Sequence, residues 1–304
     1  MKPDFIRRLS TLSIFFRAHE PLARWTTFGV GGPADVWVEP RNFRELAAVL
    51  RLAREEGAPT VVLGRGANVL VADAGFRGIV VHLRGGFRRV VLRPPFLFAG
   101  GAVPLGRAVW LGIEAGHGGW EKLMAVPSSI GGALIMNAGC YGQEISDVLD
   151  SVLIMDEGGR TRLLRARDLV FGYRSSPLRG LGIVCWAAFR LRPGSRMELL
   201  AAAREVAHKR RISLPSGRSA GSVFKNPPGR KAKELIGSCG LAGASMGGAA
   251  ISPQHPNFIL NLRHAAAGDI LALMRAAKAA VWEHHGIRLE EEVRIIGFDA
   301  PPAP

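Results

Sequence analysis

The chain has 304 residues, 48% of them hydrophobic, and a formal net charge of +15. This length and hydrophobic content predict about two folded domains and exclude an intrinsically disordered protein. Its apolar runs are far shorter than the roughly 20 residues of a membrane-spanning helix, and Arg17, His19 and Glu20 interrupt the N-terminal run at 12–16. We therefore expect neither a secretory signal nor a membrane span.

The cysteines and the basic residues indicate the compartment and the class of ligand. Cys140, Cys185 and Cys239 are scattered and form no C-x-x-C pair, which argues against a disulfide framework or a metal site and favours the reducing cytoplasm. The basic residues are dispersed, with the tightest cluster at 209–211, and no aromatic–basic alternation of an RNA-binding strand accompanies them. The charge fits a nucleic-acid partner and a phosphate-bearing small ligand equally well.

Helix and strand patterns alternate through the first half of the chain. Asn42 and Glu45 form an N-terminal capping pattern, apolar residues follow at helical spacing, and Gly57 ends the predicted helix. A second helix is predicted from Pro104 to near Gly116. Strands are predicted at 61–63, 79–83, 90–92 and 183–191, with a hairpin formed by 152–155 and 161–164.

The second half is predicted to hold two helices and a closing strand, after a boundary near 192–194. The elements are a helix from Ser195 towards Arg211 with Glu198 as capping partner, a helix at 269–285 stopped by Gly286, and a strand at 293–296. These patterns predict an α+β protein with a larger N-terminal part and a smaller C-terminal part.

Two glycine-rich turns carry the strongest functional signal. The first is residues 64–69, Gly-Arg-Gly-Ala-Asn-Val; the second runs from Pro127 to Gly132 and continues to Asn-Ala-Gly at 137–139. Where no Cβ intervenes, backbone N–H groups approach an anion closely, and that anion is usually phosphate. Neither turn fits a G-x-G-x-x-G or a P-loop pattern, and each alone is as consistent with a tight turn in a chain that has 38 Gly. The pair favours a nucleotide cofactor.

Two further loops contain candidate catalytic residues. Arg174 follows an aromatic residue in a loop flanked by Gly and Ser, where it can present a rigid fork to a carboxylate or phosphate; the alternative is a surface arginine. Ser222 lies in a turn with Lys225 and Asn226 nearby. No G-x-S-x-G elbow surrounds it, so it fits a proton donor better than a nucleophile, with a plain turn serine as the alternative.

Three adjacent carboxylates precede the last predicted strand. Strand alternation sends Glu290 and Glu292 to one face and Glu291 to the other. One of the pair can therefore point into a cleft, and the alternative is a solvated edge.

Six motifs share the order and spacing of a known family. They are residues 27–32 (Thr-Phe-Gly-Val-Gly-Gly), 63–71, 131–139, 172–175 (Gly-Tyr-Arg-Ser), 221–227 (Gly-Ser-Val-Phe-Lys-Asn-Pro) and 292–294 (Glu-Val-Arg). Together they make the chain resemble the UDP-N-acetylenolpyruvoylglucosamine reductases, flavoenzymes that complete UDP-N-acetylmuramate in peptidoglycan synthesis. The resemblance runs from about residue 26 to 297, and no long insertion separates Tyr173 from Gly221. The chain therefore resembles the shorter, type II branch.

The resemblance implies a vanillyl-alcohol-oxidase or PCMH-type FAD-binding fold in residues 1–193, in two α+β subdomains at about 1–85 and 86–193. A smaller α+β substrate-binding domain would occupy 194–304. The resemblance also implies non-covalent FAD, NADPH as co-substrate and a UDP-sugar substrate, in the cytoplasm, with no nucleic-acid partner and no metal. The implied FAD-binding residues are Gly64, Arg65, Gly66, Ala67, Asn68, Val69, Pro127, Ser128, Ser129, Gly131, Gly132, Asn137 and Gly139.

The same resemblance implies roles at the substrate. Arg174 and Glu292 would stabilise an enol-like intermediate, and Ser222 would protonate its C2 carbon. Glu292 would have to be protonated or hydrogen-bonded, because a bare carboxylate repels the developing negative charge. The implied substrate-binding residues are Tyr173, Lys209, Asn226 and Arg294.

Four positions depart from the family pattern. Ser128 replaces a Gly, Ala67 a common Ser, Cys140 a common Ala and Ala242 a frequent Lys. The first three change side-chain hydrogen bonds near FAD but leave the backbone donors, whereas Ala242 removes one expected phosphate contact.

Two alternative functions stay open at this point. Another FAD-dependent sugar or lactone oxidoreductase of the same fold is one, although such enzymes often bind FAD covalently through a His and the glycine-rich turns contain none. A basic nucleic-acid-binding protein is the other, and it leaves both turns unexplained.

Overall fold

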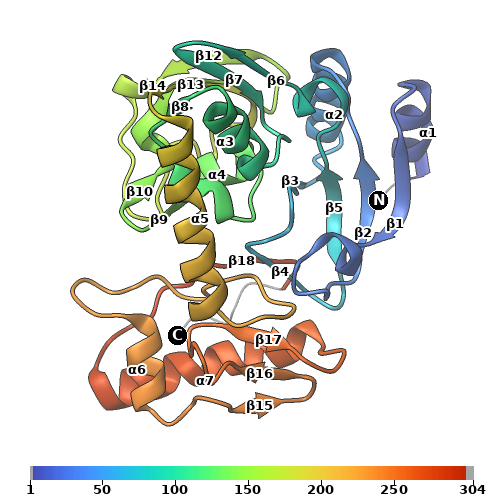
Figure 1. The fold of residues 1–304 in the computed structure, drawn as a ribbon. Helices are drawn as coiled ribbons and strands as arrows, with labels where there is room; N and C mark the ends of the chain where they lie inside the picture. Colours follow the sequence, from blue (N-terminus) through green and yellow to red (C-terminus); the bar gives the residue numbers. More distant parts are fainter. Residues whose placement is uncertain (1–2, 299–304) are drawn as a thin grey trace. The chain divides into compact units, whose positions relative to one another are not determined.

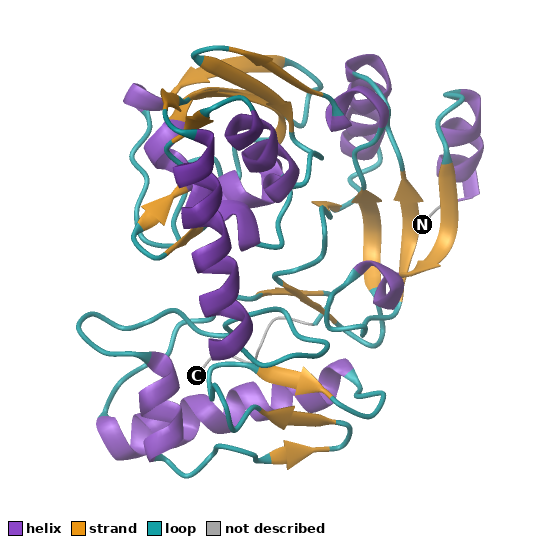
Figure 2. Ribbon diagram, viewed as in Figure 1, coloured by secondary structure: helices purple, strands orange, loops and turns teal. Residues whose placement is uncertain are grey.

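The computed structural model describes residues 3–298, which divide into two compact units (Figure 1). Within the described residues, the first unit comprises 3–17, 36–65 and 78–210, and the second comprises 18–35, 66–77 and 211–298. Both units mix helices with strands (Figure 2). No helix in residues 3–298 combines the length and the apolar character needed to cross a membrane.

A five-stranded sheet and the helices against it form most of the first unit. Its strand order is β12-β11-β13-β7-β6, and every neighbouring pair is antiparallel. Helices α3 and α4 pack against strands of this sheet. The bounds are β6 Val90–Arg93, β7 Phe96–Gly100, α3 Leu105–Glu114, α4 Ile130–Met136, β11 Leu149–Met155, β12 Thr161–Arg165, β13 Ile183–Arg190 and α5 Arg196–Ser213.

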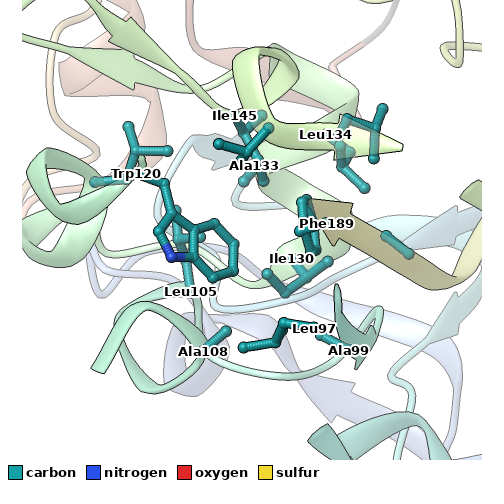
Figure 3. Close-up of a cluster of buried hydrophobic side chains, with 14 of the residues drawn as sticks. Leu97, Ala99, Leu105, Ala108, Trp120, Ile130, Ala133, Leu134, Ile145 and Phe189 are labelled. Carbon is teal, nitrogen blue, oxygen red and sulfur yellow. The ribbon is translucent and has the colours of Figure 1, made fainter. Parts of the chain in front are cut away.

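The core between this sheet and its helices is closely packed around two aromatic rings. Trp120 and Phe189 are both fully buried, and their ring centroids lie 4.8 Å apart. Leu105, Ile130 and Leu134 from the two helices belong to the same buried cluster (Figure 3). Burial of such side chains supplies most of the free energy that holds an element in place, so the helix that follows the second glycine-rich turn is fixed by its apolar face.

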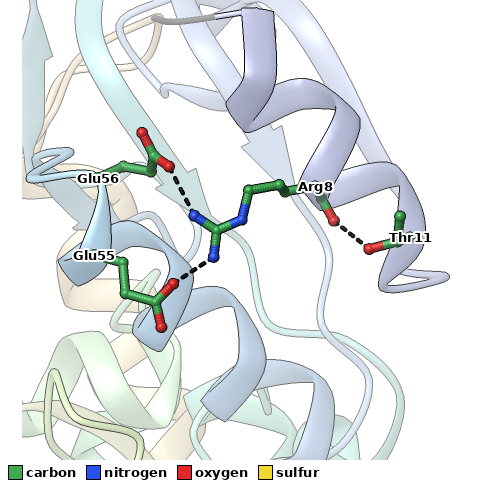
Figure 4. Close-up of polar contacts among 4 residues, drawn as sticks. All are labelled: Arg8, Thr11, Glu55 and Glu56. Atoms are coloured by element: carbon green, nitrogen blue, oxygen red, sulfur yellow. Dashed lines mark hydrogen bonds and ion pairs between the residues drawn. The ribbon is translucent and has the colours of Figure 1, made fainter.

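A four-stranded sheet with order β1-β2-β5-β3 and two helices make up the N-terminal region. The bounds are α1 Pro3–Thr11, β1 Phe16–Pro21, β2 Pro33–Val38, α2 Phe43–Glu55, β3 Thr60–Val62 and β5 Phe76–Val81. Arg8 of α1 donates to Glu56 over 2.8 Å and also pairs with Glu55, while the Thr11 hydroxyl donates to the Arg8 carbonyl (Figure 4). These polar groups are largely at the surface, so the pairing orients α1 more than it stabilises the fold.

The second unit is built around α7, Ala267–His285, which packs against α6, Ala232–Ser238, and against a three-stranded antiparallel sheet. Asp73 caps the start of α7, since its two carboxylate oxygens accept from the backbone N–H groups of Ala267 and Gly268 at 2.8 and 2.9 Å. The strands of this unit are β4 Val69–Val71, β15 Ser245–Met246, β16 Ala249–Ile251, β17 Ile259–Asn261 and β18 Arg294–Ile296, and β4 pairs with β18 in parallel.

Shorter elements complete the described chain. They are the two-residue strands β8 His117–Gly118, β9 Gly139–Cys140, β10 Gln143–Glu144 and β14 Arg192–Pro193, and the 3-10 turns η1 Leu22–Trp25, η2 Gly85–Arg88, η3 Glu121–Ala125, η4 Ile145–Val148 and η5 Ala166–Asp168.

Most elements with strong local patterns form where the sequence predicts them. Asn42 Oδ1 accepts from the Glu45 N–H at 2.9 Å at the start of α2, and β11 and β12 form the predicted hairpin. Several boundaries differ from the predictions by a few residues, and two of the differences have a clear structural cause. Helix α7 begins two residues early because Asp73 satisfies its first N–H groups, and β18 begins at Arg294 because Val293 takes part in an irregular pairing described below.

Candidate active site

The first glycine-rich turn, residues 64–68, offers unused backbone donors. Within the described residues, none of its N–H groups donates a hydrogen bond to the protein. Glycine is required at two of its positions: a Cβ on Gly64 would lie 2.5 Å from Ser129 Oγ, and a Cβ on Gly66, whose φ is +63°, would lie 1.9 Å from the Trp25 carbonyl oxygen. Two positions of the turn have no room for a side chain, and its backbone N–H groups are available as hydrogen-bond donors. This combination suits the binding of an anion.

The second glycine-rich segment is different, because most of its N–H groups are used within the protein. Gly131 donates to the Gly101 carbonyl at 2.8 Å and Ile130 to that of Val103 at 2.9 Å. Ser129 is the N-cap of α4, and its hydroxyl accepts from Gly132 N–H at 3.3 Å. This segment is the packed start of a helix, so its backbone donors are less available than the sequence predicts.

Asn137 links the second segment to the loop that carries Arg174. It is completely buried and has a left-handed φ of 42°. Its Nδ2 donates to Glu144 Oε2 at 2.6 Å and to the Gly172 carbonyl at 3.0 Å, while its buried Oδ1 has no protein partner among the described residues. A buried acceptor without a partner is costly, so this oxygen is a candidate to meet a donor of a bound molecule.

Arg174 lies at the tip of a tight turn. The backbones of Gly172 and Ser175 exchange two hydrogen bonds of 3.1 and 3.0 Å, and Arg174 between them has a left-handed φ of 50°. Its guanidinium donates to the Gly139 carbonyl at 2.9 Å and lies 5.3 Å from the centre of the Tyr173 ring. Left-handed backbone in a residue other than glycine is uncommon and is often found at functional sites.

Cys140, beside Gly139, is a neutral thiol. Burial raises its pKa, although the nearby charges of Arg210, Arg174 and Lys122 act in the opposite direction. Its Sγ lies 2.9 Å from the Lys122 carbonyl, to which the thiol donates. The cysteine therefore acts as a hydrogen-bond donor that holds the loop, and a raised pKa disfavours the nucleophilic thiolate.

In the second unit, the Ser222 segment lies in extended pairing with the Glu292 segment. Lys225 N–H donates to the Glu290 carbonyl at 2.9 Å, and Glu292 N–H donates to the Val223 carbonyl at 2.8 Å. Ser222 itself forms a bridge with Phe258 on the other edge. Two residues that the sequence predicts as catalytic are thus carried on adjacent, hydrogen-bonded stretches of backbone.

A bulge interrupts the extended pairing of the Ser222 and Glu292 segments. Both Glu292 and Val293 donate to the same Val223 carbonyl, at 2.8 and 3.2 Å, which is the signature of a β-bulge. Bulges re-aim side chains and occur beside active sites. Glu290 pairs with Lys225, and Glu291 pairs with Lys278 at 2.6 Å, so these two carboxylates have local partners. Because the bulge breaks the alternation, the expected common face of Glu290 and Glu292 stays a prediction.

Asn68 connects the first glycine-rich turn to Glu292. Its Nδ2 donates to the Glu292 carbonyl at 2.9 Å, and its own carbonyl accepts from Arg294 N–H at 3.1 Å. The next residue, Val69, is opposite Arg294 in the β4–β18 pair. This residue, which the sequence predicts to bind the cofactor, also fixes the backbone on both sides of the bulge.

The remaining predicted substrate residues have structural partners as well. Asn226 Oδ1 accepts from Ala232 N–H at 3.0 Å at the start of α6. Lys209 is exposed on α5 and pairs with Glu205 one turn away, which raises the pKa of Lys209. Arg174, Tyr173 and Lys209 belong to the first unit, whereas Ser222, Asn226, Glu292 and Arg294 belong to the second.

Comparison with known proteins assigns the chain to a family. The FAD binding domain family matches residues 34–165, and the family of the C-terminal domain of UDP-N-acetylenolpyruvoylglucosamine reductase matches residues 213–296. A UDP-N-acetylenolpyruvoylglucosamine reductase from Heliobacterium modesticaldum is 42% identical over 281 residues, which cover 91% of this chain and 90% of that protein. The chain belongs to the UDP-N-acetylenolpyruvoylglucosamine reductase family.

Further relatives agree over nearly the whole length of this reductase. UDP-N-acetylenolpyruvoylglucosamine reductase 2 from Symbiobacterium thermophilum is 40% identical over 285 residues, covering 93% of this chain and 92% of that protein. The crystal structure of the Thermus caldophilus enzyme superposes with a TM-score of 0.81 at 36% identity, covering 93% of this chain and 99% of that one. The predicted fold class, an FAD-binding fold followed by a smaller α+β domain, is confirmed, and the chain is an FAD-dependent oxidoreductase.

The residues present fit an FAD-binding reductase. The free N–H groups of residues 64–68 are donors that suit the phosphates of a dinucleotide. In the first unit, the unpartnered Asn137 oxygen is an acceptor for a donor of a bound molecule. Sequence reasoning missed Asp73 and Asn257, whose side chains bind backbone groups distant in the chain, and Glu144, which accepts from the Asn137 side chain seven residues away. The sequence contains one indication for Asn257, because Asn257 and Asn261 flank the short apolar run 258–260, which is typical of a buried strand.

Proposed function

We propose that this protein is a cytoplasmic, NADPH-dependent reductase of UDP-N-acetyl-3-O-(1-carboxyvinyl)-glucosamine that forms UDP-N-acetylmuramate in peptidoglycan synthesis. The observation that carries the proposal is the family membership over more than nine-tenths of the chain. The pairing of the Ser222 and Glu292 segments supports it further, because a proton donor and a charge-stabilising carboxyl group are needed in the same half-reaction.

We propose residues 1–193 as the FAD-binding region and 194–304 as the substrate-binding domain. The first glycine-rich turn, with its free N–H groups, suits the FAD diphosphate. Around the second segment, the Ser129 hydroxyl caps α4 and the Asn137 amide donates to the Gly172 carbonyl, so both side chains stabilise the backbone there. The bound FAD supplies hydride transfer, from NADPH to the vinyl CH2 carbon of the substrate. No His lies in either turn, which supports non-covalent binding.

The proposed catalytic residues act on the charge and the proton that follow hydride transfer. Arg174 is held by a tight turn and by the Gly139 carbonyl, and its guanidinium suits the substrate carboxylate, where negative charge develops. Glu292 supports the same charge when it is protonated or donates a hydrogen bond. Ser222 donates the proton to C2, because a hydroxyl is fully protonated at neutral pH.

Four further residues are proposed at the substrate. Arg294 and Lys209 provide positive charge for the diphosphate, and Tyr173 and Asn226 provide polar contacts. Asn226 Oδ1 also accepts from the Ala232 N–H at the start of α6, which fixes the orientation of this side chain. Ala242 cannot supply the cation that the family often has at this position.

A flavin spectrum followed by two half-reactions tests the proposal. Purified protein should be yellow, denaturation should release the flavin into the supernatant, and anaerobic NADPH should bleach it. Addition of the enolpyruvyl substrate should then restore the oxidised spectrum. Flavin that stays with the precipitated chain would favour a covalent sugar or lactone oxidoreductase. Colourless protein that takes up no FAD and binds random DNA tightly would favour the nucleic-acid-binding alternative.

A further inference from the structure

A buried asparagine lies behind the Ser222 segment. Asn257 is 3% exposed and lies in the turn between β16 and β17. Its Oδ1 accepts from the Phe224 N–H at 2.9 Å, and its Nδ2 donates to the Phe224 carbonyl at 2.8 Å. Its own carbonyl accepts from the Val223 N–H at 2.9 Å. Asn257 therefore binds three backbone groups of the two residues directly after Ser222, the N–H of Val223 and the N–H and carbonyl of Phe224.

The Asn257 side chain makes the two hydrogen bonds to Phe224 that a neighbouring strand would otherwise make. The backbone of Phe258 is already engaged, because its N–H donates to the His255 carbonyl and its carbonyl accepts from Ser252 N–H, both at 2.8 Å. A side-chain amide presents a donor and an acceptor at the spacing of a peptide group. Without it, the N–H and carbonyl of Phe224, a residue only 2% exposed, would lose their partners, which is costly in a buried segment.

The same stretch is held on its other edge by the Glu292 bulge. The Val223 carbonyl accepts from both Glu292 and Val293, and Lys225 N–H donates to Glu290. The peptide groups after Ser222 are thus fixed from two sides, by Asn257 and by the bulge. A slide of the segment by one residue would send Ser222 to the other face.

We propose that Asn257 is a positioning residue that sets the register of Ser222 against Glu292 for proton transfer to the substrate. The inference rests on the proposed function, since it assigns Asn257 a task only in the half-reaction that uses Ser222. A displacement of about 1 Å in a reacting group can cost roughly 10²-fold in rate. Loss of the Asn257 amide should therefore slow the reoxidation of reduced flavin by substrate and spare its reduction by NADPH.

A matched control exists in the same unit. Asn261 is also buried, 8% exposed, and its side chain also makes two backbone hydrogen bonds, to the Phe28 carbonyl at 2.8 Å and from the Ala265 N–H at 2.9 Å. Stopped-flow traces of the full-length holoenzyme should give a reoxidation rate for Asn257→Ala that is lower by about 10–100-fold. The Asn261→Ala variant should lose similar thermal stability but stay within about threefold of the wild type in reoxidation.

Two further variants separate positioning from folding. Because Asn257 acts through Ser222, the double variant Ser222→Ala/Asn257→Ala should reoxidise no more slowly than Ser222→Ala alone. In Asn257→Asp, a protonated carboxyl group restores one donor and one acceptor, so its rate relative to wild type should rise as the pH is lowered. This variant keeps the test open if Asn257→Ala does not fold.

The outcomes distinguish the two proposals. Equal slowing of both half-reactions by Asn257→Ala, additive losses in the double variant, a flat pH ratio for Asn257→Asp or an equal loss in Asn261→Ala would overturn the positioning role. If Ser222→Ala slows reoxidation and Asn257→Ala does not, the inference fails and the proposed function stands. If wild-type reduced flavin is not reoxidised by the enolpyruvyl substrate, the function and the inference fail together.

Discussion

The change of Ser222 to alanine should slow only the half-reaction that consumes the enolpyruvyl substrate. Within the described residues the Ser222 hydroxyl makes no hydrogen bond, and the following peptide groups are held by Asn257 and the Glu292 segment. The substitution therefore removes a proton donor without removing a structural contact, and stability should change by less than about 0.5 kcal/mol. General acid catalysis is worth about 10²–10⁴-fold, which corresponds to a barrier increase of roughly 3–5 kcal/mol.

Stopped-flow absorbance at the flavin band resolves both halves of the cycle. NADPH should bleach Ser222→Ala at nearly the wild-type rate, whereas reoxidation by substrate should be slower by that factor. Ser222→Cys should recover part of the rate because a thiol can still donate a proton. Ser219→Ala in the same loop is the control and should leave both rates unchanged. Equal slowing of both halves would make Ser222 a binding or folding residue, and slowing of neither would refute its assignment.

Three other measurements test the electrostatics and the fold. If the net charge of +15 serves a diphosphate substrate, the KM for the UDP-sugar should rise with ionic strength while flavin reduction at saturating NADPH changes little; a salt-independent KM would contradict this. Asp73→Ala removes both hydrogen bonds at the start of α7 and should lower the free energy of unfolding by about 1–3 kcal/mol, so an unchanged thermal midpoint would count against the cap. Burial lowers the pKa of His82, so the folded state binds fewer protons there and stability should fall as the pH drops through about 6.5; calorimetry should find a weaker dependence in His82→Gln, and an identical one would remove His82 from this account.

Local patterns predicted the elements whose stabilising contacts lie within a few residues. The Asn42–Glu45 cap fixes the start of α2, and Gly286 in a left-handed conformation ends α7. The β11–β12 hairpin likewise needs only a short turn. The six motifs together also pointed to the family, although each motif alone is weak. The sequence was thus sufficient for the fold class and the family, whereas the catalytic residues stay predictions.

Contacts between distant parts of the chain account for what the sequence did not reveal. Asp73 caps a helix that starts 194 residues later, and no pattern around either partner indicates the other. Ser129 and Gly131 in the second segment use their hydrogen bonds to build a helix start, which a glycine count cannot distinguish from an open turn. The bulge at Glu292 exists only because two N–H groups meet one carbonyl of the Ser222 segment, so simple alternation could not foresee it.

The pairing of β4 with β18 has a consequence for synthesis of the protein on the ribosome. Asn68 and the Glu292 carbonyl that it binds are 224 residues apart, so the first glycine-rich turn leaves the exit tunnel long before the strand that fixes it. Until then Asn68 and β4 lack their partners, and Asp73 has no helix to cap. Contacts of such sequence separation form late. A truncated chain that ends before Arg294 would lack the strand that pairs with β4, beside the first glycine-rich turn. A fragment that starts at Arg211 would lack Asn68 and Asp73, which bind the Glu292 carbonyl and the start of α7.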